Sequence, residues 1–359
     1  MNAATKLLRV GLIGYGFVGK GFHAPLIGAT EGMRLTAVAS SDEAKVRADL
    51  PDVEVFADPE AMIDSGSIDL VVIASPNTTH VRLADLAIAA RLHVVVDKPF
   101  TPTLAEARIL IARAEQQSVM IAVFQNRRWD SDYLAVREVI ESGILGRIVH
   151  FESHIDRFRP AVRDRWREQG LPASGLWFDL GPHLVDQALQ LFGLPDSIQA
   201  SFAAQRDDAR IEDWAHVIMA YGGLRVILHC SLVAMGTARF IVHGTAGSAF
   251  KTEADHQEAQ LLAGVVPGTG DWGSDPDPLV LIDAAGKRSE RPASGDQRRF
   301  YANVVEHLAG RGANPVPGVQ AIAVSAVLEA AATAAQTGQS TPINLSDAER
   351  EAWSWSMRK

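Results

Sequence analysis

The chain has 359 residues, of which 47% are hydrophobic and 21% charged, a composition typical of a globular enzyme long enough for two domains. Its 34 basic and 43 acidic residues give a net charge of −9, which argues against nucleic acid or an anionic membrane surface as a partner. The single cysteine, Cys230, excludes an internal disulfide framework and a thiolate metal cluster.

The first predicted strand, Leu7 to Ile13, runs directly into a glycine-rich turn, and a predicted helix follows from Lys20 to Ala29. A glycine triplet between a strand and a helix is typical of dinucleotide-binding folds. The first glycine permits the tight turn, the second lets backbone N–H groups approach a pyrophosphate, and the third lets helix and strand pack closely. The predicted cofactor contacts in this turn are Gly14, Gly16, Phe17 and Gly19.

The second predicted strand, Leu35 to Ala39, ends in Ser40-Ser41-Asp42, where a dinucleotide fold must recognise the ribose. An acid at this position accepts from the ribose 2′-OH and favours NAD, whereas a nearby arginine favours the 2′-phosphate of NADP. Asp42 is followed by Lys45 and Arg47, and it is equally suited to cap the next helix. The sequence therefore predicts NAD or NADP without choosing between them.

The third predicted strand, Asp69 to Ala74, stops at the turn Ser75-Pro76-Asn77, and a helix is predicted from Val81 to Arg91. Proline and asparagine are turn formers in any setting, but at the end of a parallel strand they also face a bound cofactor. His80 lies beside this turn, where it either contacts the cofactor or caps and packs the helix.

The fourth predicted strand, Leu92 to Val96, ends in Asp97-Lys98-Pro99, which places a lysine where open α/β sheets bind their ligands. An ammonium in so apolar a setting requires a partner, and Asp97 is adjacent. The alternative is a surface ion pair after a strand. A helix from Leu104 to Gln117 and a strand from Val119 to Phe124 continue the alternation, which predicts a doubly wound parallel Rossmann sheet over residues 1–124.

The alternating run Ile148 to Ile155 predicts a strand with His150, Glu152 and His154 on one face. Two histidines and a carboxylate can bind a metal. A polar strand face at a substrate cleft or a subunit contact explains the same pattern, and we predict no metal site. The arginines that follow, at positions 157 to 167, indicate either an anion site or a solvated turn and helix.

A second candidate chemical centre lies in the segment Gly175 to Phe192. Read as a helix, this segment places Asp179, His183 and Asp186 on one face, at i, i+4 and i+7. Carboxylates among leucine, tryptophan and phenylalanine must be paired or used, so the alternatives are a buried ion pair and a catalytic site.

The remaining elements suggest a second domain over residues 125–345 with a mostly antiparallel sheet. Strand-like runs at hairpin spacing cover Asp213 to Tyr221, Leu224 to Val233 and Arg239 to His243, and helices are predicted over Gln297 to Ala309 and Val319 to Thr337. A capping box at Ser346 to Glu349 opens a predicted helical tail over residues 346–359 that carries two tryptophans.

Three motifs together resemble the Gfo/Idh/MocA oxidoreductases: the glycine triplet, Ser75-Pro76-Asn77 and Asp97-Lys98-Pro99. The segments Gln125 to Asp130, Asp156 to Pro160 and Arg165 to Glu168 further resemble the branch that contains NADP-dependent scyllo-inositol dehydrogenases and YdgJ-type oxidoreductases. The resemblance runs from about Arg9 to Leu345, and it implies an N-terminal Rossmann domain and a C-terminal α/β domain with a large open sheet. The chain differs from the family pattern in having Asp97 for glutamate, Gln125 for histidine, and Asp42 for the arginine of the inositol enzymes.

This resemblance implies hydride transfer between a nicotinamide and a hydroxyl or keto carbon of a cyclitol or sugar, with an inositol-type substrate favoured. It implies Lys98, Asp179 and His183 as catalytic residues, with the histidine as base. The expected cofactor contacts are Gly14, Gly16, Phe17, Gly19, Ser40, Ser41, Asp42, Ser75, Pro76, Asn77, His80, Asp97 and Lys98, and the expected substrate contacts are Asn126, Arg157 and Trp166.

Other functions remain open at this stage: an aldose or glycoside oxidoreductase, a non-catalytic dinucleotide-binding sensor, or a different enzyme on a glycine-rich Rossmann fold. No run appears long and apolar enough to span a bilayer, and Met1 to Lys6 lack the apolar core of a signal peptide. We therefore expect a cytoplasmic protein without a membrane partner, which assembles as a homodimer or homotetramer.

Overall fold

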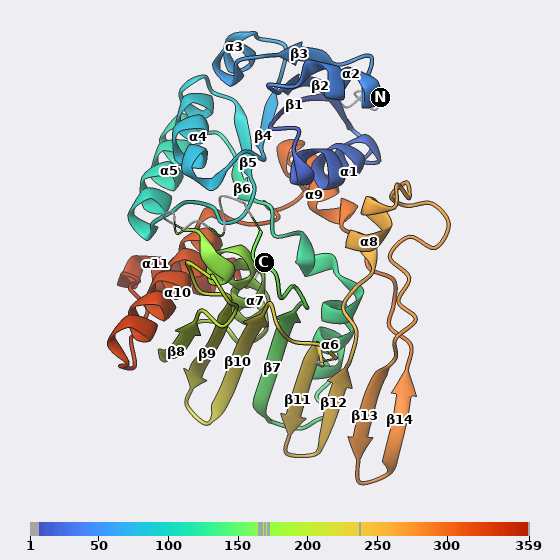
Figure 1. Ribbon diagram of the computed structural model, residues 1–359, viewed down its shortest axis with the longest axis vertical. Coiled ribbons are helices and arrows are strands. Elements are labelled where there is room, and N and C mark those ends of the chain that lie inside the picture. Colours follow the sequence, from blue (N-terminus) through green and yellow to red (C-terminus); the bar gives the residue numbers. More distant parts are fainter. Residues whose placement is uncertain (1–6, 164–167, 169, 171–172, 237, 358–359) are drawn as a thin grey trace.

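The computed structural model describes residues 7–163, 168, 170, 173–236 and 238–357, which form two β-sheets with their helices (Figure 1). The smaller sheet lies at the top of Figure 1 and the larger sheet at the bottom. The predicted α/β fold class is confirmed, because the first sheet is parallel and the second is mostly antiparallel.

The first sheet has six parallel strands in the order β3-β2-β1-β4-β5-β6. The apolar runs that form its centre are buried because helices cover both faces. The strand order reverses between β1 and β4, and doubly wound sheets bind ligands at the carboxyl ends of the strands at such a point. The strands are β1 (Leu8–Ile13), β2 (Met33–Ala39), β3 (Glu54–Phe56), β4 (Leu70–Ile73), β5 (His93–Val96) and β6 (Ile121–Val123).

The helices of this sheet follow their strands, as the alternation predicted. The helix expected from Lys20 begins as a π-helical turn, η1 (Gly19–His23), and continues as α1 (Ala24–Gly28). The helix expected from Leu104 has the predicted bounds, because Thr103 and Glu106 form a reciprocal capping box at its start. The others are α2 (Glu43–Asp49), α3 (Pro59–Asp64), α4 (His80–Ala89) and α5 (Leu104–Gln117), with a 3₁₀ turn η2 (Asn77–Thr79) before α4.

The second sheet has eight strands in the order β14-β13-β12-β11-β7-β10-β9-β8. The predicted hairpin of β9 and β10 is confirmed. The predicted hairpin of β10 and β11 is wrong, because β7 lies between these two strands and runs parallel to β10. The strands are β7 (Ile148–Asp156), β8 (Ser197–Ala203), β9 (Trp214–Tyr221), β10 (Leu224–Ser231), β11 (Phe240–Gly244), β12 (Gly247–Lys251), β13 (Leu279–Asp283) and β14 (Gly286–Glu290).

Helices α7 and α10 pack on one face of this sheet, and α10 also contacts the core of the first sheet. The expectation that no run could span a bilayer was wrong for α10 by length and composition, but the helix is mostly buried, as core helices are. The helices of this half are η3 (Asn126–Trp129), α6 (Ser131–Glu141), α7 (Gly175–Phe192), α8 (Gln257–Leu262), α9 (Arg298–Leu308), α10 (Gly318–Thr337) and α11 (Asp347–Ser356).

The terminal helix α11 begins with the predicted capping box, in which Ser346 and Glu349 exchange hydrogen bonds. Glu349 also forms an ion pair with Arg108 of α5, with 2.7 Å between Nε and Oε1. Trp353 is buried against the body of the protein, whereas Trp355 is 55% exposed.

Candidate active site

Lys98 lies at the carboxyl end of β5, where the chain leaves the sheet and meets helix α7. Its ammonium donates to the backbone carbonyl of Asp179 at 2.7 Å and to the Oδ1 atom of the same residue at 3.0 Å. The sequence suggested Asp97 as the partner of this lysine; the structure instead pairs it with an acid 81 residues later in the chain. The ammonium is thus held across the boundary between the two sheets.

His183 lies one helical turn after Asp179 and is buried. Its Nδ1 atom has no hydrogen-bond partner among the residues that the structure describes. Burial lowers the pKa of His183 well below its usual value, and the positive charges of Lys98 and Arg127 lower it further. The imidazole is therefore neutral at neutral pH, the state that a general base requires.

A hollow of about 410 Å³ joins these groups. It brings together the three predicted catalytic residues, two of the predicted substrate residues, one residue of the glycine-rich turn and Asp97, although the sequence separates them widely. The predicted residues that line it are Phe17, Asp97, Lys98, Asn126, Arg157, Asp179 and His183. A lysine and a neutral imidazole in one cavity can stabilise an alkoxide and accept its proton, the two tasks of alcohol oxidation.

The same hollow also contains Arg127 and Glu258, two charged residues that were not among the predicted site residues. Arg127 donates to Asp130 at 3.0 Å and to Glu258 of α8 at 2.5 Å. Arg157 lies 3.7 Å from the other carboxylate oxygen of Glu258. No local sequence signal could identify Glu258, because α8 reaches the site only through the path of the chain after β12.

A second hollow of about 410 Å³ lies over the glycine-rich turn. Gly14 has φ +93°, and a Cβ on it would lie 2.8 Å from the carbonyl oxygen of Ala74. A Cβ on Gly16 would meet nothing within 4 Å, so this backbone borders open space, as a pyrophosphate requires. The residues present therefore fit a dinucleotide. The predicted cofactor residues that line this hollow are Gly14, Gly16, Ser40, Ser41, Asp42, Ser75 and Pro76.

Gly19 does not line the hollow but allows close packing within the glycine-rich turn. A Cβ on Gly19 would lie 2.0 Å from the carbonyl oxygen of Gly14, so only glycine allows this approach. This contact is the close packing of helix and strand expected for the third glycine of the motif.

Asp42 combines the two roles that the sequence left open. Its Oδ1 atom accepts from the backbone N–H of Lys45 at 3.0 Å, so it caps α2, and its side chain also borders the dinucleotide hollow. Lys45 lines the same hollow. An acid and a lysine therefore lie together where the ribose of a dinucleotide is recognised.

Two further predicted contacts, His80 and Asn77, line neither hollow. His80 is buried, and its Nδ1 and Nε2 atoms lie 2.9 Å from the carbonyl oxygen of Pro99 and 3.0 Å from that of Ser75. The side chain therefore connects two loops. Asn77 is also buried and donates to the carbonyl of Ala173 at 3.1 Å. Trp166 lies outside the described residues.

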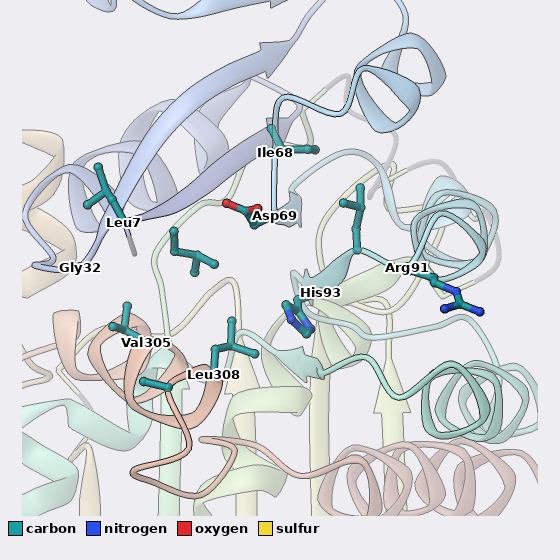
Figure 2. Close-up of a pocket in the computed structure, with 11 residues that line it drawn as sticks. Leu7, Gly32, Ile68, Asp69, Arg91, His93, Val305 and Leu308 are labelled. Atoms are coloured by element: carbon teal, nitrogen blue, oxygen red, sulfur yellow. The ribbon is translucent and has the colours of Figure 1, made fainter. Parts of the chain in front are cut away.

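A third hollow, of about 430 Å³, lies at the opposite edge of the parallel sheet (Figure 2). Ile68 and Asp69 precede β4, and His93 begins β5, so this hollow is at the amino ends of the strands. Figure 2 shows Val305 and Leu308 of α9 bordering it. Ligands of doubly wound sheets bind at the carboxyl ends, so we do not assign this hollow to the active site.

Comparison with known proteins agrees with this arrangement. Residues 8–125 match the model of the oxidoreductase family NAD-binding Rossmann fold, and residues 137–345 match that of the oxidoreductase family C-terminal alpha/beta domain. The chain is 48% identical over 327 residues to the uncharacterized oxidoreductase YdgJ of Escherichia coli, covering 90% of this chain and 94% of the relative. It is 35% identical over 331 residues to the scyllo-inositol 2-dehydrogenase (NADP(+)) IolW of Bacillus subtilis, covering 90% and 92%.

The crystal structure of a putative oxidoreductase from Klebsiella pneumoniae has 56% sequence identity and a TM-score of 0.93, and the alignment covers 98% of this chain and 99% of that one. Both family models and these relatives lead to the same assignment. The chain belongs to the Gfo/Idh/MocA family of NAD(P)-dependent oxidoreductases.

Proposed function

We propose that this dehydrogenase oxidises a CH–OH group of a cyclitol or sugar, and that an inositol-type ring is its substrate. The observation that carries the proposal is the ammonium of Lys98, held 3.0 Å from the Oδ1 atom of Asp179 in one hollow with the neutral imidazole of His183. The substrate class is supported by the similarity to IolW, which is described as an NADP-dependent scyllo-inositol 2-dehydrogenase.

In this mechanism His183 removes the proton of the reacting hydroxyl, which its lowered pKa leaves it free to accept at neutral pH. Lys98 donates to the same oxygen and stabilises the negative charge that develops there. Asp179 positions the lysine through the two contacts described above. Gly14, Gly16, Ser40 and Asp42 would hold a bound dinucleotide, whose nicotinamide would supply the acceptor for the hydride of the carbinol carbon.

Substrate hydroxyls are assigned to Asn126 and Arg157, with Trp166 retained from the sequence analysis. Asn126 is fixed from behind, because its Nδ2 atom donates to Gln297 at 2.9 Å, and its amide oxygen is left to accept from a substrate hydroxyl. Arg157 directly follows strand β7, lies 3.7 Å from Glu258 and supplies donors to the hollow.

We further propose a division into residues 1–124, 125–345 and 346–359, a cytoplasmic location, and a homo-oligomer. The family models divide the chain at a similar place, at residues 125 and 137.

The first experiment is the initial rate of nicotinamide reduction with scyllo-inositol, using NAD⁺ and NADP⁺ in parallel. Turnover with either cofactor supports the proposal, and the ratio of the two rates reveals the effect of Asp42 and Lys45. If neither cofactor is reduced, an inositol substrate is wrong, and a screen of aldoses, glycosides and other polyols follows. Dinucleotide binding without turnover of any polyol would favour a non-catalytic sensor and contradict the catalytic roles.

A further inference from the structure

Two histidines meet across neighbouring strands on the face of the larger sheet opposite α7. The parallel pairing of β10 with β7 places His229 directly beside His154. Asp156 lies two residues after His154 and therefore on the same face of β7. The sequence pattern showed His150, Glu152 and His154 as a group, but it could not show that a second histidine arrives from β10.

The carboxylate of Asp156 lies between these two imidazoles. Its Oδ2 atom is 3.5 Å from Nδ1 of His154, and its Oδ1 atom is 3.6 Å from Nε2 of His229. Both separations are too long for good hydrogen bonds. They match the separation of about 3.4 Å between two ligands of one tetrahedral Zn²⁺ with bonds of about 2.0–2.1 Å.

All three residues can direct a ligand atom to one point, because one atom from each lies within 4.8 Å of the others. Nδ1 of His154 has no hydrogen-bond partner among the described residues, and the Oδ2 atom of Asp156 lies 3.5 Å from it. Two imidazoles and a carboxylate form a ligand set that Zn²⁺ and similar first-row divalent cations prefer.

Glu152 fixes the orientation of His154 in the way that metal sites require. The Nε2 atom of His154 donates to Oε2 of Glu152 at 2.8 Å. When the ring is neutral, a proton on Nε2 leaves the lone pair on Nδ1, the atom that faces Asp156. A carboxylate that receives the second N–H of a ligand histidine is a common feature of zinc sites. Glu152 is held in turn by His150, whose Nε2 donates to Oε1 at 2.7 Å.

The group is also accessible. His154 and Asp156 line a hollow of about 440 Å³, which gives a cation a path of entry and room for water as a further ligand. Arg127, Arg157 and Arg239 border this hollow, and the carboxylates of Glu253, Asp255 and Glu258 on the same wall oppose their charge.

We propose that His154, Asp156 and His229 bind one divalent cation of the Zn²⁺ type on the open face of the larger sheet. The two histidines and the acid are the ligands, and Glu152 is a positioning residue. This site is separate from the proposed catalytic residues Lys98, Asp179 and His183, so its test does not depend on turnover. It replaces the expectation from the sequence that the chain binds no metal.

The test is metal binding to the full-length protein after treatment with a chelator. Titration with Zn²⁺ against a chromophoric indicator gives stoichiometry and affinity, and Co²⁺ reports coordination through its visible absorption. We expect one Zn²⁺ per chain and a tetrahedral Co²⁺ spectrum that Zn²⁺ abolishes. Absence of stoichiometric binding, or a Co²⁺ spectrum typical of the hydrated ion, would overturn the proposal.

Variants assign the ligands. His229→Ala should weaken binding more than Glu152→Gln, for which a loss of about 10- to 100-fold is expected. His243→Ala is the matched control, since His243 lies on the neighbouring strand β11 and contacts Ser248 and not the proposed ion. Circular dichroism verifies that each variant is folded. Equal affinity in wild type and His229→Ala would show that the group is only a set of polar contacts, as would an equal loss in His243→Ala.

Discussion

Replacing Lys98 with methionine tests the core of the proposed mechanism, because it removes the ammonium and keeps a side chain of similar length. The ammonium now donates to two oxygens of Asp179 at 2.7 and 3.0 Å. Loss of a single donor to a developing oxyanion typically lowers turnover by about 10²–10³-fold. We therefore expect kcat for polyol oxidation to fall by about this factor, with little change in dinucleotide affinity, since the glycine-rich turn is unaltered.

The same substitution has a second effect that a structural role alone would not produce. The charge of Lys98 contributes to the lowered pKa of His183. Removing that charge raises the pKa of His183, so a larger fraction of the imidazole is protonated at mildly acidic pH. The acid limb of the kcat/KM profile should therefore move to higher pH in Lys98→Met.

Protein stability should change only moderately. The side chains of Lys98 and Asp179 are 14% and 27% exposed, which places this ion pair between an exposed pair and a fully buried one. Its loss is expected to cost about 1–2 kcal/mol, since exposed pairs contribute about 0–1 kcal/mol and broken buried pairs cost about 3–5 kcal/mol. The variant should therefore remain folded.

Initial rates with both nicotinamides, fluorescence titration of the reduced cofactor and a pH series provide the assay. Lys287→Met is the matched control, because Lys287 is exposed on β14 and lines neither hollow. An equal loss of turnover and of cofactor affinity in Lys98→Met would refute a catalytic role for Lys98, as would unchanged turnover.

Three further predictions concern the base, the ribose site and the buried charges. In the wild type, kcat/KM for oxidation should stay level from neutral pH down to about pH 6.5 and decline only at lower pH, because the lowered pKa keeps His183 unprotonated in this range. A decline centred above pH 7 would contradict this expectation. Asp42→Asn keeps a side chain that can cap α2 but removes a negative charge. The ratio of kcat/KM with NADP⁺ to kcat/KM with NAD⁺ should therefore rise, and an unchanged ratio would exclude Asp42 from ribose recognition. Arg128→Met leaves the buried carboxylate of Asp186 unpaired and should lower the free energy of unfolding in urea by about 3–5 kcal/mol, whereas Arg82→Met, at an exposed pair, should cost less than about 1 kcal/mol.

Local signals predicted the elements that carry them. Helix α5 has the bounds expected from its sequence, since the capping box of Thr103 and Glu106 and the apolar spacing both lie within the segment. Strand β14 was not predicted, because Gly286–Glu290 is charged and largely exposed, and it exists as a strand through its pairing with β13. Neither propensity nor alternation could indicate a strand formed by its neighbour alone.

In the candidate site, too, local motifs indicated some residues, whereas contacts between distant segments could not be predicted. Motifs selected Lys98, His183 and the glycine-rich turn as candidates, because each motif depends on residue types at fixed spacing along one segment. The partner of Lys98 and the contribution of Glu258 could not be predicted, since both depend on which distant segments meet at the carboxyl ends of the strands. His80 was predicted as a cofactor contact, but both of its ring nitrogens face backbone carbonyls, and the sequence could not indicate these partners.

Helix α7 shows why partners decide between structure and chemistry. Asp179 and Asp186 share one face with His183, and the helical spacing alone does not distinguish the two acids. The structure separates them, because the Asp186 carboxylate is 2% exposed and bidentate with the guanidinium of Arg128 at 2.8 and 2.6 Å. Both oxygens of this carboxylate are occupied inside the protein, so it has no access to a ligand. Asp179 faces the hollow with 27% exposure and holds a lysine whose remaining N–H can reach a substrate oxygen. An acid on a helix face is therefore assigned to catalysis by the partner it holds and by the solvent it reaches, and these two properties arise only when β5 and α7 meet.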